Sequence, residues 1–101
     1  MINSSALSKM KPSAILINTA RGPLVNQSDL AAALNEGIIA GAGIDVLDEE
    51  PPKDNPLLNG VKNLIMTPHS AWSTREARQR LIEDVAETIQ SLEKGVPRNL
   101  L

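Results

Sequence analysis

Three short runs of apolar residues stand out along the chain, and none of them alternates between apolar and polar positions. They cover residues 14–17, 38–46 and 64–66. An unbroken apolar run of this length is typical of a strand that is covered on both faces, as strands in parallel sheets are. With their flanking residues, the runs predict strands over 14–18, 38–46 and 63–67.

Helical spacing is found before and between these runs. Residues 3–10 and 27–36 carry apolar positions three and four apart, which predicts a short helix in each segment. Suitable N-cap residues precede both helices, and a glycine after the second can end it in the left-handed conformation. These residues are Asn3 or Ser4 for the first helix, and Asn26 with the final Gly37 for the second.

The last segment predicts the longest helix. Ser73 and Glu76 have the spacing of a capping box, in which each side chain accepts a hydrogen bond from the other residue's backbone N–H. Gly95, followed by Pro97, marks the end of this helix. Its apolar residues share one face: Ala77, Leu81, Ile82, Val85, Ile89 and Leu92.

The order of the predicted elements is helix, strand, helix, strand, loop, strand and helix. The loop, residues 48–60, is polar and rich in proline, which excludes it from the interior of a sheet. Helices that alternate with apolar strands favour an α/β fold with a parallel sheet. About three strands are few for such a sheet, so we expect one that is cut short.

Composition excludes several function classes. With ten basic and twelve acidic residues, a net charge of −2 and one aromatic residue, Trp72, the chain has no surface suited to nucleic acid. No apolar run reaches the ~18 residues of a membrane span, and the N-terminus lacks the pattern of a signal peptide. We therefore expect a cytoplasmic protein. One histidine and no cysteine argue against a metal site.

The core has to be built without Phe or Tyr. Aliphatic side chains bury less area than aromatic rings do. We expect a chain of marginal stability, or one that needs a partner surface.

Three polar residues with complementary chemistry follow the apolar runs: Arg21, Glu50 and His69. Because parallel strands end at the same edge of a sheet, these side chains are expected in one crevice. Arginine can bind a carboxylate with two parallel hydrogen bonds, and imidazole exchanges protons near neutral pH. Taken singly, each has a simpler interpretation: Arg21 as a surface arginine, Glu50 as a loop carboxylate and His69 as a structural histidine.

Asp45 lies inside the second apolar run, where a carboxylate needs hydrogen-bond donors. It could cap a nearby turn or accept a bond from an amide-bearing ligand, and the sequence leaves both open. The remaining acids of the loop, Asp48, Glu49 and Asp54, are expected to be solvated. Gly41 and Gly43 do not form a dinucleotide fingerprint, since no third glycine or helix start follows. We expect them to let a helix pack closely on the strand.

Segments 18–25, 40–52 and 67–72, taken together, resemble the D-isomer-specific 2-hydroxyacid dehydrogenases. Residues 55–58 and Trp72 are most similar to the glycerate dehydrogenase/hydroxypyruvate reductase branch. The resemblance implies a partial Rossmann-like sheet with flanking helices and a long C-terminal helix. Residues 1–101 would be the C-terminal portion of the dinucleotide-binding domain, with its N-terminal half and the substrate domain absent. We expect a truncated reading frame, a proteolytic remnant or an excised domain.

The resemblance also assigns roles. Arg21 would bind the substrate carboxylate and carbonyl oxygen, and Glu50 would hold the catalytic imidazole in its protonated form. His69 would protonate the carbonyl oxygen as hydride arrives from the nicotinamide. The residues on the cofactor side would be Thr19, Ala20, Arg21, Asp45, His69, Ser70 and Ala71.

The function that follows is NAD- or NADP-dependent reduction of a 2-oxo acid, of the hydroxypyruvate or glyoxylate type, to a D-2-hydroxy acid. The glycine-rich phosphate turn of the family has no counterpart here, so we expect weak or absent dinucleotide binding and no useful turnover by the isolated chain. The alternative is a non-catalytic module that self-associates through a sheet edge or the long helix, or pairs with a full-length relative. The sequence leaves open which 2-oxo acid is preferred and which of the two dinucleotides is used.

Overall fold

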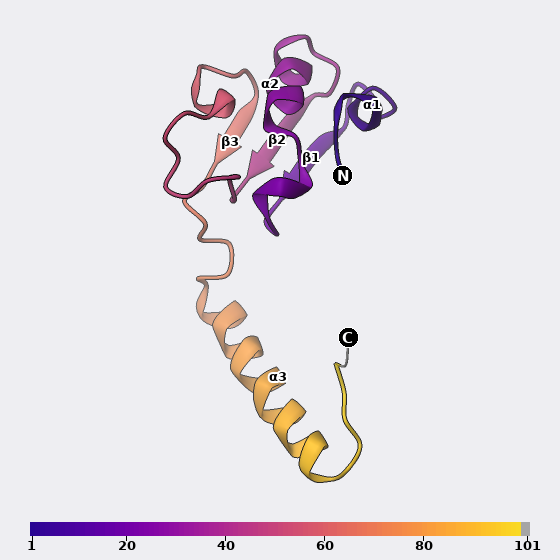
Figure 1. The fold of residues 1–101 in the computed structure, drawn as a ribbon, viewed down its shortest axis with the longest axis vertical. Helices are drawn as coiled ribbons and strands as arrows, with labels where there is room; N and C mark the ends of the chain where they lie inside the picture. The colour runs from indigo at the N-terminus through magenta and orange to yellow at the C-terminus, as the bar shows by residue number, and fades with distance from the viewer. Residues whose placement is uncertain (100–101) are drawn as a thin grey trace. The chain divides into compact units, whose positions relative to one another are not determined.

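A computed structural model of the chain describes residues 1–99, which divide into two compact units, Met1–His69 and a second that begins at Ser70. The first unit contains three parallel strands in the spatial order β1-β2-β3, labelled in Figure 1. Their bounds are β1 Ile15–Asn18, β2 Gly41–Ile44 and β3 Leu64–Met66. The prediction of an α/β fold with a small parallel sheet is confirmed.

The register of the sheet aligns the carboxyl ends of its strands. Asn18 of β1 pairs with Ile44 of β2, and Ile44 pairs with Met66 of β3. The segments that follow the three strands therefore begin side by side at one edge of the sheet.

Two α-helices belong to the first unit, α1 (Ser4–Leu7) and α2 (Gln27–Asn35). Each begins at a predicted cap: Asn3 accepts from the Ala6 N–H at 3.1 Å, and Asn26 accepts from the Asp29 N–H at 3.0 Å. Gly37 follows α2 with φ +72°, the left-handed conformation expected of a helix stop. Two 3₁₀ helices complete the unit, η1 (Gly22–Leu24) and η2 (Pro56–Leu58).

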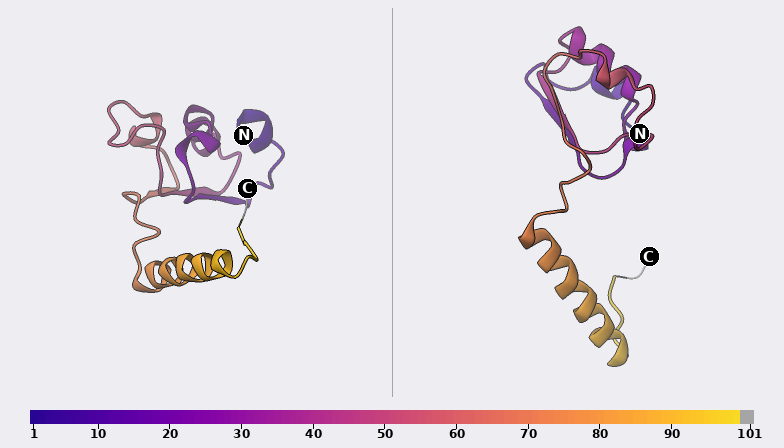
Figure 2. Two further views of the ribbon diagram at one scale, coloured as in Figure 1. Left: turned by 60° about the horizontal axis from the view of Figure 1, so that its bottom comes forward. Right: turned by 90° about the vertical axis from the view of Figure 1, so that its left-hand side faces the viewer.

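The core lies on one side of the sheet, where the helices of the first unit pack, as the right-hand view of Figure 2 shows. It is aliphatic throughout, as the composition requires. Its large buried members are Leu7, Leu16, Val25, Leu30, Leu34, Ile39, Ile44 and Leu57.

The opposite side of the sheet is apolar and exposed in the first unit. Ile15 and Ile17 of β1 are 66% and 71% exposed, and Ile65 of β3 is 72% exposed. The expectation that the strands are covered on both faces is therefore wrong for β1 and β3. The physical reason is that both α-helices of this unit pack on the same side.

The strand glycines also differ from expectation. A Cβ on Gly41 would lie 3.1 Å from the backbone oxygen of Asn63, and one on Gly43 would lie 3.8 Å from Cγ1 of Ile17. No helix atom is among these neighbours. The prediction that a helix packs closely on these glycines is wrong, because Gly41 instead admits the backbone that leads into β3.

The second unit contains α3 (Arg75–Glu93). Its N-cap is Thr74, whose Oγ1 accepts from the Ala77 N–H at 3.1 Å. The predicted capping box at Ser73 is wrong by one residue, because the Ser73 hydroxyl donates to the backbone oxygen of Ser70 at 2.6 Å. The helix ends before Gly95, whose φ of +72° confirms the predicted stop.

Helix α3 has no buried residue within the described chain, although its apolar positions share one face. Leu81, Ile82, Val85, Ile89 and Leu92 are all at least half exposed. Among the described residues, no helix combines the length and the apolar character needed to cross a bilayer.

Candidate active site

Arg21 lies in the turn that follows β1. The turn is closed by Asn18, whose Nδ2 donates to the Arg21 oxygen at 2.8 Å and whose Oδ1 accepts from the Ala20 N–H at 3.1 Å. The Arg21 side chain is exposed, and its Nη1 donates to the Ala20 oxygen at 2.7 Å. The guanidinium is therefore accessible to an anion.

Glu50 lies in the loop after β2 and uses both carboxylate oxygens. Oε1 accepts from the Leu47 N–H at 2.7 Å, and Oε2 lies 2.6 Å from Nδ1 of His69. The Leu47 N–H bond first, and the bond to the His69 imidazole second, lower the pKa of Glu50 below its ordinary value. The carboxylate is thus held in its charged form beside the imidazole.

His69 follows β3 at a sharp turn. Its backbone N–H donates to the Thr67 oxygen at 3.0 Å, two residues back, across Pro68, as in an inverse γ-turn. His69 itself has φ +52°, a left-handed conformation that only a few per cent of non-glycine residues adopt. Such conformations are concentrated at functional sites, where surrounding contacts maintain them.

The Glu50–His69 pair lines two neighbouring cavities. One, of about 210 Å³, also has Arg21 and Gly22 in its wall. The other, of about 280 Å³, has Asp45 in its wall. The Arg21 guanidinium thus lines one cavity and the buried Asp45 carboxylate lines the other, with the Glu50–His69 pair common to both. The structure brings Arg21, Glu50 and His69 together in the smaller cavity.

Asp45 is 4% exposed and directly follows β2. Its Oδ1 accepts from the Thr67 hydroxyl, and its backbone N–H donates to the Asn18 oxygen at 2.9 Å. The Thr67 bond fits the simpler interpretation of Asp45 as a turn-capping residue. The position in the cavity wall fits the interpretation as a ligand residue, so the geometry leaves both roles available.

The other predicted cofactor-side residues are less closely associated with these cavities. Thr19 and Ala20 are exposed in the turn after β1 and line neither cavity. Ser70 and Ala71 belong to the second unit. Within that unit, the Ser70 oxygen accepts from the Ser73 N–H at 2.9 Å.

The sequence reasoning missed two residues that shape the site. Asn18 ends the predicted strand 14–18, and an asparagine that closes an apolar run signals that its side chain is needed there. Gly22 has no side chain that a chemical pattern in the sequence could single out. A Cβ at Gly22 would lie 2.2 Å from both the carbonyl carbon and the oxygen of Leu47, so this glycine lets the two loops touch.

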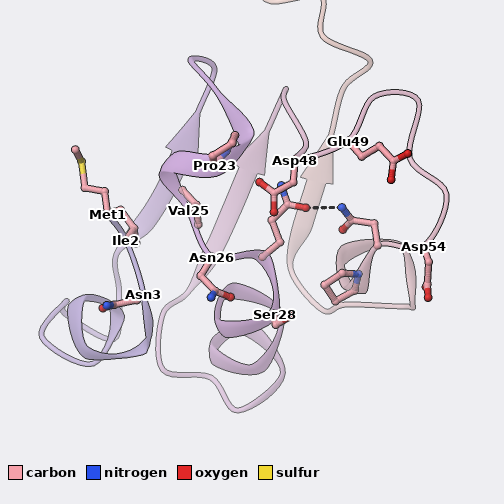
Figure 3. Close-up of a pocket in the computed structure, with 13 residues that line it drawn as sticks. Met1, Ile2, Asn3, Pro23, Val25, Asn26, Ser28, Asp48, Glu49 and Asp54 are labelled. Atoms are coloured by element: carbon pink, nitrogen blue, oxygen red, sulfur yellow. Dashed lines mark hydrogen bonds between the residues drawn. The ribbon is translucent and has the colours of Figure 1, made fainter.

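A further cavity, of about 590 Å³, lies elsewhere in the first unit and contains none of the predicted catalytic residues (Figure 3). Its wall includes the exposed acids Asp48, Glu49 and Asp54. It also includes the buried pair Gln27 and Asn55, which join α2 to η2 through an amide–amide hydrogen bond. Among residues 1–99, no group of three potential ligand side chains could hold a metal ion.

Comparison with known proteins identifies the family. Residues 1–71 match the family model described as "D-isomer specific 2-hydroxyacid dehydrogenase, NAD binding domain". The chain belongs to the D-isomer-specific 2-hydroxyacid dehydrogenase family. The resemblance found in the sequence is confirmed, and the family's members are oxidoreductases.

Relatives in this family match the whole chain. Glycerate dehydrogenase of Methylorubrum extorquens is 48% identical, across 100% of this chain and 33% of that enzyme. Glyoxylate reductase of Korarchaeum cryptofilum is 47% identical, across 100% of this chain and 31% of that enzyme. The chain therefore spans about one third of the length of these relatives.

Solved structures show the same fold over this region. The acyclic imino acid reductase Bsp5, in complex with NADPH and D-Arg, superposes with a TM-score of 0.77 at 41% identity, covering 97% of this chain and 31% of that one. A Sinorhizobium meliloti NADPH-dependent glyoxylate/hydroxypyruvate reductase, in complex with NADP and malonate, superposes with a TM-score of 0.67 at 34% identity. The match covers 89% of this chain and 28% of that one.

Proposed function

We propose that residues 1–101 are the C-terminal portion of the dinucleotide-binding domain of an NAD(P)-dependent D-2-hydroxyacid dehydrogenase, which reduces glyoxylate or hydroxypyruvate. The observation that carries the proposal is the Glu50–His69 contact of 2.6 Å in a cavity shared with Arg21. Relatives named glycerate dehydrogenase, hydroxypyruvate reductase and glyoxylate reductase support the substrate class.

In this proposal His69 is the proton donor for carbonyl reduction. Its Nδ1–H donates a hydrogen bond to Glu50. The other ring nitrogen, Nε2, is therefore the one that exchanges a proton with the substrate oxygen. Arg21 binds the substrate carboxylate with two parallel hydrogen bonds and orients the carbonyl toward His69.

The residues present suit the nicotinamide end of a dinucleotide, which supplies hydride when bound. The cavity beside Asp45 has three prolines in its wall, Pro51, Pro52 and Pro68, which suit a flat ring. The buried Asp45 carboxylate is an acceptor for a carboxamide N–H. Thr19 and Ala20 in the first unit, and separately Ser70 and Ala71 in the second, are proposed to contact the dinucleotide through their backbone.

The phosphate end has no matching group in this sequence. No glycine-rich turn opens a helix, so backbone donors for a pyrophosphate are missing. We therefore expect weak or absent dinucleotide binding, and no useful turnover, from the 101-residue chain alone. Purified chain that reduced hydroxypyruvate or glyoxylate with NADH or NADPH above trace rates would contradict this expectation.

A chimera tests the catalytic assignment. The third of the M. extorquens glycerate dehydrogenase that matches this chain is replaced by residues 1–101, and NADH oxidation is followed with hydroxypyruvate. We expect activity in the chimera and a loss of roughly 10²–10⁴-fold in its Glu50→Gln and His69→Gln variants. Glu49→Gln, in the same loop, is the matched control and should retain the activity. Equal activity of the Glu49 and Glu50 variants would refute the assignment.

A second candidate function is association, which the exposed isoleucines of the sheet support. Ile15, Ile17 and Ile65 are exposed, Ile17 and Ile65 both lie in register with Gly43 on one face of the sheet, and β1 is an edge strand. Exposed edges and apolar faces recruit partners, and we take a second copy of the chain as the occupant. Light scattering after size exclusion should then show a dimer that Ile17→Lys dissociates and Leu58→Lys, off this face, does not. A monomeric wild-type chain would rule this function out.

A further inference from the structure

Asn18 is a buried polar residue for which the proposed mechanism has no use. It is 6% exposed at the end of β1, and its side-chain amide is directed at its own chain. Nδ2 donates to the Arg21 oxygen at 2.8 Å, and Oδ1 accepts from the Ala20 N–H at 3.1 Å. The side-chain amide of Asn18 therefore forms two hydrogen bonds with the backbone of the turn that carries Arg21.

The backbone of Asn18 connects this turn to the next strand. Its oxygen accepts from the Asp45 N–H at 2.9 Å, directly after the pairing of Asn18 with Ile44. A single buried residue thus fixes the Arg21 turn relative to the strand end that carries Asp45. These two positions line the two cavities beside His69.

The far side of the turn is fixed by packing. Gly22 lies so close to Leu47 that a Cβ would be 2.2 Å from its carbonyl oxygen. The Leu47 N–H in turn donates to Glu50 at 2.7 Å. The Arg21 side chain is exposed, and its Nη1 donates to the Ala20 oxygen within its own turn. The position of the guanidinium therefore depends on these backbone restraints.

We propose that Asn18 is a positioning residue for Arg21. It fixes the backbone of the turn so that the guanidinium meets a substrate carboxylate without first having to be ordered. The inference rests on the proposed function, in which Arg21 binds that carboxylate. Preorganisation of this kind raises affinity by lowering the entropy cost of binding.

Oxalate, a two-carbon dicarboxylate similar in size to glyoxylate, serves as the probe. It is titrated into the ¹⁵N-labelled 101-residue chain, and binding is followed at the Arg21 signals. Asn55→Ala is the matched control for Asn18→Ala, since Asn55 is 7% exposed, bonds to Gln27 and the Leu57 N–H, and lies outside both cavities.

The expected result is that Asn18→Ala weakens oxalate binding by roughly tenfold or more, as the loss of two hydrogen bonds implies. Asn55→Ala also loses two side-chain hydrogen bonds at a buried site, and its affinity for oxalate should equal that of the wild type. Asn18→Asp keeps an acceptor for the Ala20 N–H and loses the donor to Arg21, so it should retain Ala20 amide protection and still bind oxalate weakly. Wild-type affinity in folded Asn18→Ala would overturn the inference.

A wild-type chain that binds no oxalate would count against the proposed function itself. The positioning role is then decided by ¹⁵N relaxation of the Arg21 backbone amide. If Asn18 positions the turn, the Arg21 backbone amide should be more mobile in Asn18→Ala than in the wild type and in Asn55→Ala. Equal order in all three proteins would show that Asn18 does not hold the turn.

Discussion

Replacing Gly22 by alanine tests whether the Arg21 turn and the Glu50 loop are held in direct contact. The added Cβ would lie 2.2 Å from the carbonyl carbon and oxygen of Leu47, and 2.5 Å from the nitrogen of Asp48. Carbon atoms pack best at about 3.5–4.0 Å, so the two loops must separate by roughly 1 Å or more. Both colliding groups belong to the backbone, and no side-chain rotation can relieve the contact.

The size of the effect follows from the cost of overpacking. Extra methyl groups in packed regions cost about 1–3 kcal/mol, and a backbone collision places Gly22→Ala at the upper end of that range. For a domain of this size, about 1 kcal/mol corresponds to a shift in Tm of about 4–8 °C. We therefore expect Gly22→Ala to lower the Tm of the first unit by more than about 10 °C.

Thermal unfolding followed by far-UV circular dichroism measures this change, with Gly43→Ala as the control. A Cβ on Gly43 would meet only Cγ1 of Ile17, at 3.8 Å, which is ordinary contact. That variant should be neutral, or more stable by up to about 1 kcal/mol, because alanine has less conformational freedom than glycine in the unfolded chain. If both variants melted at the same temperature, the close approach of the two loops would be disproved.

Two further predictions concern Glu50 and the start of α3. The pKa of Glu50 is lowered chiefly by the Leu47 N–H and secondly by His69, so in His69→Ala it should rise and still remain below its ordinary value, as a ¹³C titration of the carboxyl would measure. Since the folded pKa is the lower one, the stability that Glu50 contributes is present above the unfolded value of about 4.3 and is lost as the pH falls through the folded value. A complete return to the ordinary pKa in His69→Ala would show that Leu47 is not the main cause. At the start of α3, Thr74→Ala should reduce the helicity of α3 and lower its stability by about 1 kcal/mol, whereas Ser73→Ala should have a smaller effect. Circular dichroism measures both variants, and a larger loss of helicity in Ser73→Ala than in Thr74→Ala would show that Ser73 is the cap.

Local signals in the sequence were sufficient for most element boundaries. Asn26 and Gly37 delimit α2 because a cap and a left-handed stop each act on backbone groups within a few residues of themselves. The choice between Ser73 and Thr74 was not available from sequence. Both side chains carry a hydroxyl. Ser73 is not the cap because its hydroxyl donates to the backbone oxygen of Ser70.

Burial was predicted less well than secondary structure. The apolar run that contains Ile15 and Ile17 has the composition of a strand covered on both faces, and the strand itself was predicted correctly. Whether a face is covered depends on what else packs there, and an apolar run carries no information about that. In the first unit only one side of β1 is covered, so these two side chains are exposed.

For the candidate site, the rule that parallel strands end at a common edge was enough to bring Arg21, Glu50 and His69 to one cavity. The rule places residues after strands and says nothing about the bonds that orient them. The side-chain contacts of Asn18 depend on the conformation of its own turn, and the contact of Gly22 with Leu47 joins two loops at positions 25 residues apart in sequence (47 − 22 = 25). Only the folded chain contains that information.

The contacts around the site form a continuous series within the first unit. Asn18 bonds to Asp45, Asp45 to Thr67, and Thr67 to the backbone of His69. His69 then meets Glu50 through its side chain. The groups proposed to bind the carboxylate and to donate the proton are thus oriented by the chain's own contacts. Its sequence has no glycine-rich turn opening a helix, the feature that would direct backbone N–H groups at a pyrophosphate. It follows that the isolated chain should show an ordered Glu50–His69 pair and an anion-binding Arg21 even where it transfers no hydride, so that anion binding and turnover are separable properties of this chain.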